Sequence, residues 1–282
     1  MIFITDNGLL MQFIPNVIES VEGETPLFNK ILPQLTATEQ WLIDEIVNGE
    51  VAPMIASEDA KKCLYARTVI ACEAMARAVP ALDLVLTPNG YGVVSNSNVA
   101  PASKERVTRL QAMLRDSRDK ALNLLLLKEL KSEIHWRDSD QARWLRSSYF
   151  VSVLKDTEAA KAIVQTDDRW EGLLELREKA RPVEQAIAEK WIGQALTARL
   201  MATLASDYFG SSDTVALAKA VRTAILDELI SGKRPVKNLD RIVNYIRDNA
   251  SLYPEWQSDP VAELFADKWR FQNKKKSPGY FF

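Results

Sequence analysis

The chain has 282 residues, of which 47% are hydrophobic and 26% charged, and both values are ordinary for a globular protein. Its 36 basic and 38 acidic residues leave a net charge of −2. We therefore expect no strongly basic surface for nucleic acid or an anionic membrane, beyond non-specific contact. One large domain or two modest ones fit this length, and neither needs a disulfide or a metal to fold.

The two cysteines, Cys63 and Cys72, lie nine residues apart within one helical pattern. Nine residues of helix span about 13.5 Å, which is too far for a disulfide. We interpret both as buried apolar residues of a protein kept in a reducing compartment. The start of the sequence carries Asp6 and no basic region, so we expect no signal peptide. No segment approaches 18 uncharged apolar residues, and we expect a soluble protein made in the cytoplasm.

Helix signals dominate the first half of the chain. Thr25 followed by Pro26 predicts a short helix to about residue 32. The capping box "TATE" (36–39) predicts a helix that stops at Asn48. Ser57 is expected to cap the next helix, to about residue 79.

A long helix is expected from about residue 101 to 131, opened by Pro101 or Ser103. Its middle, "RDSRDK" (115–120), offers i,i+4 pairs of Arg115 with Asp119 and of Asp116 with Lys120, as in a solvated section. Its end, "ALNLLLLKEL", is apolar almost all round. Such an end predicts burial in a core or against another chain.

The second half continues as helices. Their predicted ranges are about 139–150, 157–165, 168–180, 182–209 with an end at Gly210, 212 or 213 to 230 with closure at Gly232, 236–250 and 258–271.

Segment 82–95 breaks this helical pattern. The runs "LDLVL" and "YGVVS" flank "TPNG". In such a turn Pro88 presets φ, Asn89 tolerates the third position and Gly90 accepts a positive φ, which predicts a three-residue β-hairpin with a bulge. An isolated two-stranded hairpin is marginal in water. We expect it to pack either on its own helices or on the same element of a neighbouring chain.

The predicted fold is therefore all-α: a multi-helix bundle with one inserted β-hairpin, at about residues 82–95. A boundary near 136–156 would divide it into a helical domain with the hairpin (1–136) and a second helical bundle (137–282). A single continuous domain remains the alternative.

Two stretches, "FIPNVIESVEGETPLFNKILPQL" and "VPALDLVLTPNGYGVVSNSNVAPASKERV", resemble a family of helical proteins from phages and prophages of Bacteroidetes. The resemblance covers residues 12–120, and genes of that family lie among genes for virion morphogenesis. Its members resemble head–tail connector (adaptor) proteins.

Connector adaptors are small helical bundles that form a ring beneath the portal, commonly of about twelve copies. Loops or hairpins and a C-terminal tail contact the portal and the next ring. The resemblance thus implies a virion structural protein of the phage neck, present in the host cytoplasm during assembly. Its implied partners are copies of itself, the portal and tail-completion proteins. This chain is considerably longer than a typical adaptor, which suggests an added helical domain.

The C-terminal stretch "RFQNKKKSPGYFF" joins three lysines to three aromatic residues across a helix-breaking Ser-Pro-Gly. One interpretation is a frayed end with solubilising lysines. The other is an extended peptide that orders on a partner, with the aromatic residues as anchors.

Candidate interface residues come from three places: the hairpin, the segment "HWRDSDQARWLRSSYF" and the tail. Tryptophan and arginine are residue types that interfaces favour, although packing within the core explains tryptophans equally well. The candidates are Leu84, Leu86, Pro88, Asn89, Gly90, Tyr91, Val93, Trp136, Trp144, Arg146, Lys274, Lys275, Lys276, Tyr280, Phe281 and Phe282.

We find no motif for catalysis, metal binding or a cofactor. The single histidine, His135, cannot form a two-histidine metal site, and the cysteines lack ligand spacing with it. The sequence has no phosphate-binding glycine motif and no nucleophile elbow. We therefore expect no enzyme. The alternatives kept open are a helical scaffold or assembly chaperone that stays out of the particle, and an enzyme whose cleft would hold convergent, pKa-shifted carboxylates.

Overall fold

The computed structural model describes residues 2–14, 25–58, 60–82, 84–87, 90–93, 103–151, 161–166 and 168–266. These residues are mostly helical, so the predicted all-α class is confirmed. None of the described helices is both long enough and apolar enough to cross a membrane.

The elements fall into two groups along the chain. The first comprises α1 (Asn7–Met11), α2 (Leu27–Lys30), α3 (Leu32–Trp41) with its π-helical continuation η1 (Leu42–Val47), α4 (Ala52–Glu58), α5 (Ala60–Ala78), η2 (Val79–Ala81), β1 (Leu84–Thr87), β2 (Gly90–Val93), α6 (Lys104–Leu124), η3 (Leu125–Glu129), η4 (Leu130–Ser132), α7 (Ile134–Arg137) and α8 (Asp140–Arg146). The second comprises α10 (Arg169–Ile187), η5 (Ala188–Ile192), α11 (Gln194–Asp207), α12 (Asp213–Ser231), α13 (Val236–Asp248), η6 (Ala250–Leu252), α14 (Pro254–Gln257) and α15 (Pro260–Leu264).

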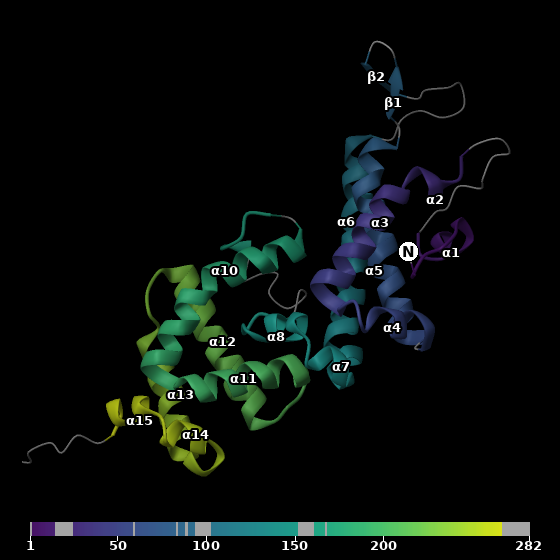
Figure 1. The fold of residues 1–282 in the computed structure, drawn as a ribbon. Helices are drawn as coiled ribbons and strands as arrows, with labels where there is room; N and C mark the ends of the chain where they lie inside the picture. The colour runs from purple at the N-terminus through teal and green to yellow at the C-terminus, as the bar shows by residue number, and fades with distance from the viewer. Residues whose placement is uncertain are drawn as a thin grey trace, which may run out of the picture.

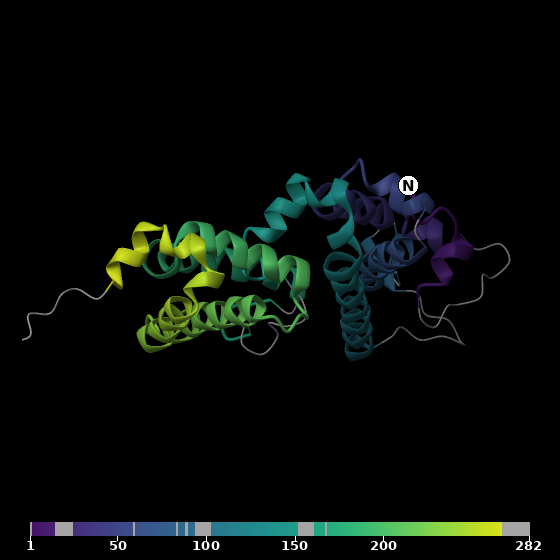
Figure 2. The same ribbon diagram turned by 90° about the horizontal axis from the view of Figure 1, so that it is seen from below.

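The two groups lie beside one another. Helices α5 and α6 pack along each other, and α3 packs on α5 (Figure 1). Elements from α10 onward gather on the other side, and the teal segment with α7 and α8 passes between the groups (Figure 2). Buried apolar residues of both groups nevertheless form one connected cluster. The domain boundary near 136–156 stays a prediction.

The apolar end of α6 lies where this cluster passes from one group to the other. Leu122, Leu125, Leu126, Leu127 and Leu130 are all buried. The predicted burial of this all-apolar stretch is therefore confirmed. Both cysteines are also buried and are not joined in a disulfide, as expected from their spacing.

The helix starts predicted in the first half of the chain are only partly confirmed. The short helix after Pro26 forms, but Pro26 itself is the N-cap and there is no side-chain cap. The box "TATE" caps nothing, because α3 already begins at Leu32 with a proline in its first turn, and Thr36 donates to the Leu32 carbonyl instead (2.9 Å). Ser57 lies inside α4 and donates to the Met54 carbonyl (3.3 Å), so the predicted cap there is wrong.

In α6, Ser103 is the N-cap, with its hydroxyl accepting from the Arg106 N–H at 3.4 Å. Of the two residues predicted to open this helix, Ser103 is therefore the one that caps it. The helix at 139–150 forms as α8 but ends at Arg146. Of the helix predicted at 157–165, residues 152–160 lie outside the described residues.

The predicted break at Pro182 is wrong, because α10 runs through it to Ile187. Pro182 is exposed, while the face formed by Leu173, Leu176 and Ala180 is buried, and α10 packs on α12. Burial of this continuous face outweighs the single hydrogen bond that proline removes. The chain instead leaves the helical conformation at Gly193, where φ is +78°.

The remaining helices follow their predicted signals. Ser212 caps α12 through the Val215 N–H, and Gly232 closes it with φ +67°. Helix α13 also matches its predicted range. Of the last predicted helix, at 258–271, only α15 forms among the described residues, α14 lies before it, and residues 267–282 lie outside the described residues.

Between α5 and α6 the backbone of β1 pairs antiparallel with that of β2. The register sets Leu84 opposite Val93 and Thr87 opposite Gly90. Two residues therefore separate the paired ends, not the three predicted. Pro88 and Asn89 themselves, and the side chains of both strands, lie outside the described set.

Candidate functional site

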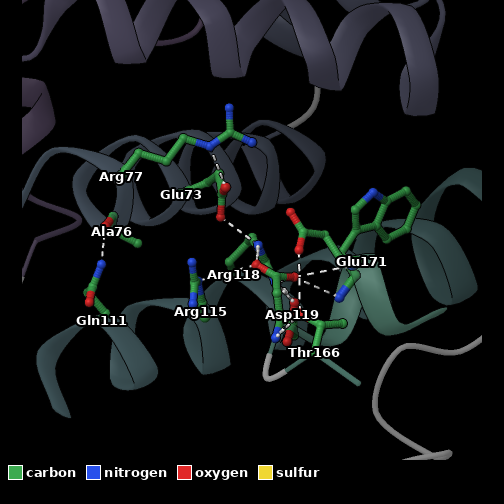
Figure 3. Close-up of polar contacts among 11 residues, drawn as sticks. Glu73, Ala76, Arg77, Gln111, Arg115, Arg118, Asp119, Thr166 and Glu171 are labelled. Atoms are coloured by element: carbon green, nitrogen blue, oxygen red, sulfur yellow. Dashed lines mark hydrogen bonds and ion pairs between the residues drawn. The ribbon is translucent and has the colours of Figure 1, made fainter. Parts of the chain in front are cut away.

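The most concentrated set of charged side chains surrounds Arg118 of α6, which is only 2% exposed. Its Nη1 donates to Glu73 Oε2 (2.5 Å) and to Asp168 Oδ2 (3.1 Å). Its Nη2 donates to Asp168 Oδ1 (3.0 Å) and to Asp119 Oδ1 (2.7 Å), which also accepts from Nε (2.9 Å). One guanidinium thus binds carboxylates from three parts of the chain (Figure 3). We call these four residues the Arg118 cluster.

Each carboxylate of the Arg118 cluster is positioned by local structure. Glu73 lies on α5, one turn before Arg77, whose Nε donates to Glu73 Oε1 at 2.6 Å. Asp168 is the N-cap of α10, and its Oδ1 accepts from the N–H groups of Trp170 (3.0 Å) and Glu171 (3.2 Å). The guanidinium on α6 therefore joins α5 to the start of α10, which belong to the two groups of helices.

Burial and the charge of Arg118 act in opposite directions on the pKa of Asp168 and on that of Asp119. Burial opposes ionisation of Asp168, but the hydrogen bonds and charge of Arg118 outweigh it and hold the pKa of Asp168 below its usual value. Burial raises the pKa of Asp119 to about 6, although Arg118 works against that shift. Asp119 Oδ2 is buried without a hydrogen-bond partner in the described structure, which leaves it free to carry a proton.

This arrangement acts as a structural tie. Its carboxylates converge on Arg118 in the interior, and all three are less than a tenth exposed. The enzymic alternative requires such groups to line a cleft. Two pockets of about 400 and 200 Å³ are lined by other residues. The described residues contain no group of three or more His, Cys, Asp or Glu that could hold a metal ion.

The prediction that the middle of α6 is solvated is wrong in part, because Arg118 and Asp119 are buried there. Asp116 pairs with Lys120 at 2.6 Å as predicted. Arg115, however, pairs with Asp168 (3.2 Å) and not with Asp119, which is fully buried. A signal was available in the sequence. Arg118 lies on the same face as buried Leu114, four residues before it, and Leu122, four after it.

Substitution of Asp119 by Asn isolates the effect of its raised pKa. Folded Asp119 holds its proton up to about pH 6, whereas an unfolded aspartate releases it near 3.8. Ionisation of Asp119 therefore lowers stability progressively as pH rises from about 4 to 6, and the loss is complete above that window. Two pKa units set an upper limit of about 3 kcal/mol.

We therefore expect the free energy of unfolding of Asp119→Asn, minus that of the wild type, to rise between pH 4 and pH 6 and then level off, as measured by urea denaturation. Asp116→Asn is the matched control. The Lys120 hydrogen bond lowers the pKa of Asp116 from its usual 3.8, so its removal should change the pH dependence in the opposite sense and only below about pH 4. A difference independent of pH for Asp119→Asn would contradict the assignment.

The predicted interface residues around α7 and α8 have different environments. Trp136 is buried and donates from Nε1 to the Ile46 carbonyl (2.7 Å), so it packs within its own chain. Trp144 is 42% exposed, and the Arg177 guanidinium stacks on its ring at 4.0 Å. Arg146 is half-buried and donates to the carbonyls of Ala142 and Arg137. Burial lowers its pKa. Trp144 is thus the exposed member of this group.

The other predicted interface residues are described in part or not at all. Leu84, Leu86, Gly90, Tyr91 and Val93 have backbone positions in the two strands, but their side chains are not described. The tail candidates Lys274, Lys275, Lys276, Tyr280, Phe281 and Phe282 lie outside the described residues. Arg177, Arg118 and Asp119 were not among the candidates from sequence.

Residues 14–145 match the model of a family of unknown function (DUF6712), which covers slightly less than half of the chain. No curated protein and no solved structure matches. The matched segment includes α5, the paired strands, α6 and α8, so it contains Glu73, Arg118 and Asp119 but not Asp168. The match relates this segment to a family whose description names no activity.

Proposed function

We propose that this protein is a structural protein of a phage or prophage virion, acting as a head–tail connector. It works by assembling with copies of itself, and with portal and tail-completion proteins, in the neck of the particle. Its contribution is geometric: a helical frame presents a β-hairpin to a neighbour. The resemblance of residues 12–120 to phage proteins first suggested this function.

The observation that carries the proposal is the position of the paired strands. In Figure 1, β1 and β2 lie beyond the ends of α5 and α6. Among the described residues they pair only with each other. A two-stranded ladder is marginal in water, and its outer edges are templates for pairing with another chain. The hairpin at 82–95 is accordingly proposed to complete its sheet, or to bury one face, on a neighbouring subunit.

The helices that lead to and from the strands support this role, because they form a rigid base. Gln111 of α6 donates at 2.9 Å to the Ala76 carbonyl, which lies two residues before the end of α5 that leads to the strands. Further along, Glu73 and Arg118 join the same two helices. A rigid base reduces the conformational entropy lost when the hairpin binds, and so favours binding.

Removal of residues 85–94 tests the role of the hairpin. Because the strands lie beyond the helix pair, we expect the deletion variant to keep its helical circular dichroism while its oligomer mass in sedimentation falls toward that of one chain. The intact protein, measured at the same concentrations, is the control. An oligomer of unchanged mass after the deletion would refute the contact.

The second candidate is a helical scaffold or chaperone that acts during assembly and leaves before the particle is complete. The exposed, arginine-stacked Trp144 suits transient contacts as well as permanent ones. The two candidates differ in one respect that can be measured, the presence of the protein in finished particles.

A further inference from the structure

A small polar pocket lies beside Trp144, between the end of α8 and the middle of α10. Its volume is about 200 Å³, and its lining includes Trp144, Ser147, Arg177, Glu178 and Arg181. A neighbouring pocket of about 400 Å³ shares Ser147 and Arg181 with it. The smaller space suits a group of side-chain size, since pockets for drug-sized ligands start at about 300 Å³.

Arg177 is the unusual residue of this pocket. It is 5% exposed, and its Nη2 donates to the Trp144 carbonyl (2.5 Å) and to Ser147 Oγ (3.2 Å). Its Nη1 is buried without a hydrogen-bond partner, and Arg177 forms no ion pair with any described residue. Burial lowers its pKa to about 10, so the group is still charged at neutral pH. A buried, charged donor without a partner is destabilising.

The surrounding charges indicate which anion would fit. Arg181 has an exposed side chain that pairs weakly with Glu178 at 3.5 Å. Glu184 lies deeper and accepts from Ser148 Oγ (2.8 Å) and the Tyr149 N–H (3.0 Å). The formal charges of the two arginines and the two glutamates sum to zero. A ligand group with one negative charge therefore fits this site better than a group with two. A planar carboxylate also matches the two-donor edge of a guanidinium.

From the buried Nη1 of Arg177, which has no hydrogen-bond partner, and the adjoining pocket, we infer that this site binds a single carboxylate group. The carboxylate takes the free donor of Arg177, and Arg181 contacts it from the rim. Because Nη1 is buried, the entering group displaces the exposed indole of Trp144 and leaves the helix core unchanged. A free carboxylic acid and an acidic side chain of a partner peptide present the same chemistry. The inference does not depend on the proposed function, since a connector, a scaffold or an enzyme could each carry such a site.

Calorimetric titration of the full chain tests the inference with four probes: free glutamate, acetyl-Gly-Glu-Gly-amide, the matched Gln peptide and inorganic phosphate. We expect saturable binding of the Glu peptide in the millimolar range or tighter, at least about tenfold stronger than that of the Gln peptide. Binding of glutamate as strong as that of the Glu peptide identifies a small-molecule site, and weaker binding identifies a peptide site. Equal binding of the Glu and Gln peptides, no binding of either carboxylate, or stronger binding of phosphate would overturn it.

Single substitutions of arginine test where the carboxylate binds. Arg177→Met and Arg181→Met are each expected to weaken binding of the favoured carboxylate by about tenfold or more. Arg181 is exposed, so its variant folds even where Arg177→Met does not. Arg143→Met removes the same charge from the exposed face of α8, outside the pocket lining, and should bind as the wild type does. A loss in Arg143→Met equal to that in Arg181→Met would show general charge attraction and refute the site.

Discussion

Replacement of Arg118 by Met is expected to lower the free energy of unfolding by about 3–5 kcal/mol, the cost of leaving buried charges without their partner. Methionine fills a similar volume but cannot donate hydrogen bonds. Glu73, Asp119 and Asp168 would then face one another with only the partly exposed Arg77 and Arg115 nearby. Urea denaturation at neutral pH measures the effect.

Arg143→Met is the matched control for this prediction. Arg143 pairs with Asp140 at 3.0 Å on the surface, where both side chains are largely exposed. Such a pair contributes about 1 kcal/mol or less. Arg118→Lys should fall between the two, because it keeps the charge and loses the planar fork that serves three carboxylates. Equal losses for Arg118→Met and Arg143→Met would mean that the Arg118 cluster does not tie the helices together.

The second large effect is expected at Gly193, between η5 and α11. Its φ of +78° with ψ of 152° is a conformation that essentially only glycine adopts, and it costs an alanine about 1–3 kcal/mol. An alanine Cβ there would also lie 2.6 Å from Asp259 Cγ, which is too close. Asp259 Oδ1 caps α15 by accepting from the Val261 N–H at 3.0 Å, so its displacement costs about 1 kcal/mol more. We therefore expect Gly193→Ala to lose about 3 kcal/mol.

Gly232→Ala measures the cost of a positive φ without a close side-chain contact. Gly232 also has a positive φ, with φ +67° and ψ 12° in the left-handed helical region, and nothing lies within 4 Å of the position that its Cβ would take. This variant should therefore show the backbone cost alone, about 1–2 kcal/mol. Thermal or urea denaturation of both variants gives the comparison. Similar losses in the two would remove the role assigned to the contact with Asp259.

Elements with strong local chemistry were predictable from the sequence. Ser212 and Gly232 bound α12, and Ser103 opens α6, because side-chain caps and a left-handed glycine act within a few residues. The burial of the leucine-rich end of α6 followed for a similar reason. A helix end that is apolar on all sides has no stable place in water.

Features decided by distant contacts were not predictable in this way. Pro182 did not end α10, because the helix is held by its packing against α12. Asp168 could be recognised as a helix start, but not as a partner of Arg118, 50 residues earlier in the chain. Arg115 was predicted to pair with Asp119 at i,i+4, and Arg118 lies in the same charged run 115–120, so both looked like residues of a solvated section. Only the approach of α5 and α10 explains the pairs that form.

The central claim, that this protein is a built-in part of a phage neck, is tested most directly by quantitative mass spectrometry of purified phage particles from a host that carries its gene. A structural protein of the neck should leave peptides from both halves of the chain in intact particles, at a copy number comparable to that of the portal protein. Absence of the protein from finished particles, together with its abundance in the lysate, would refute the connector and favour the scaffold.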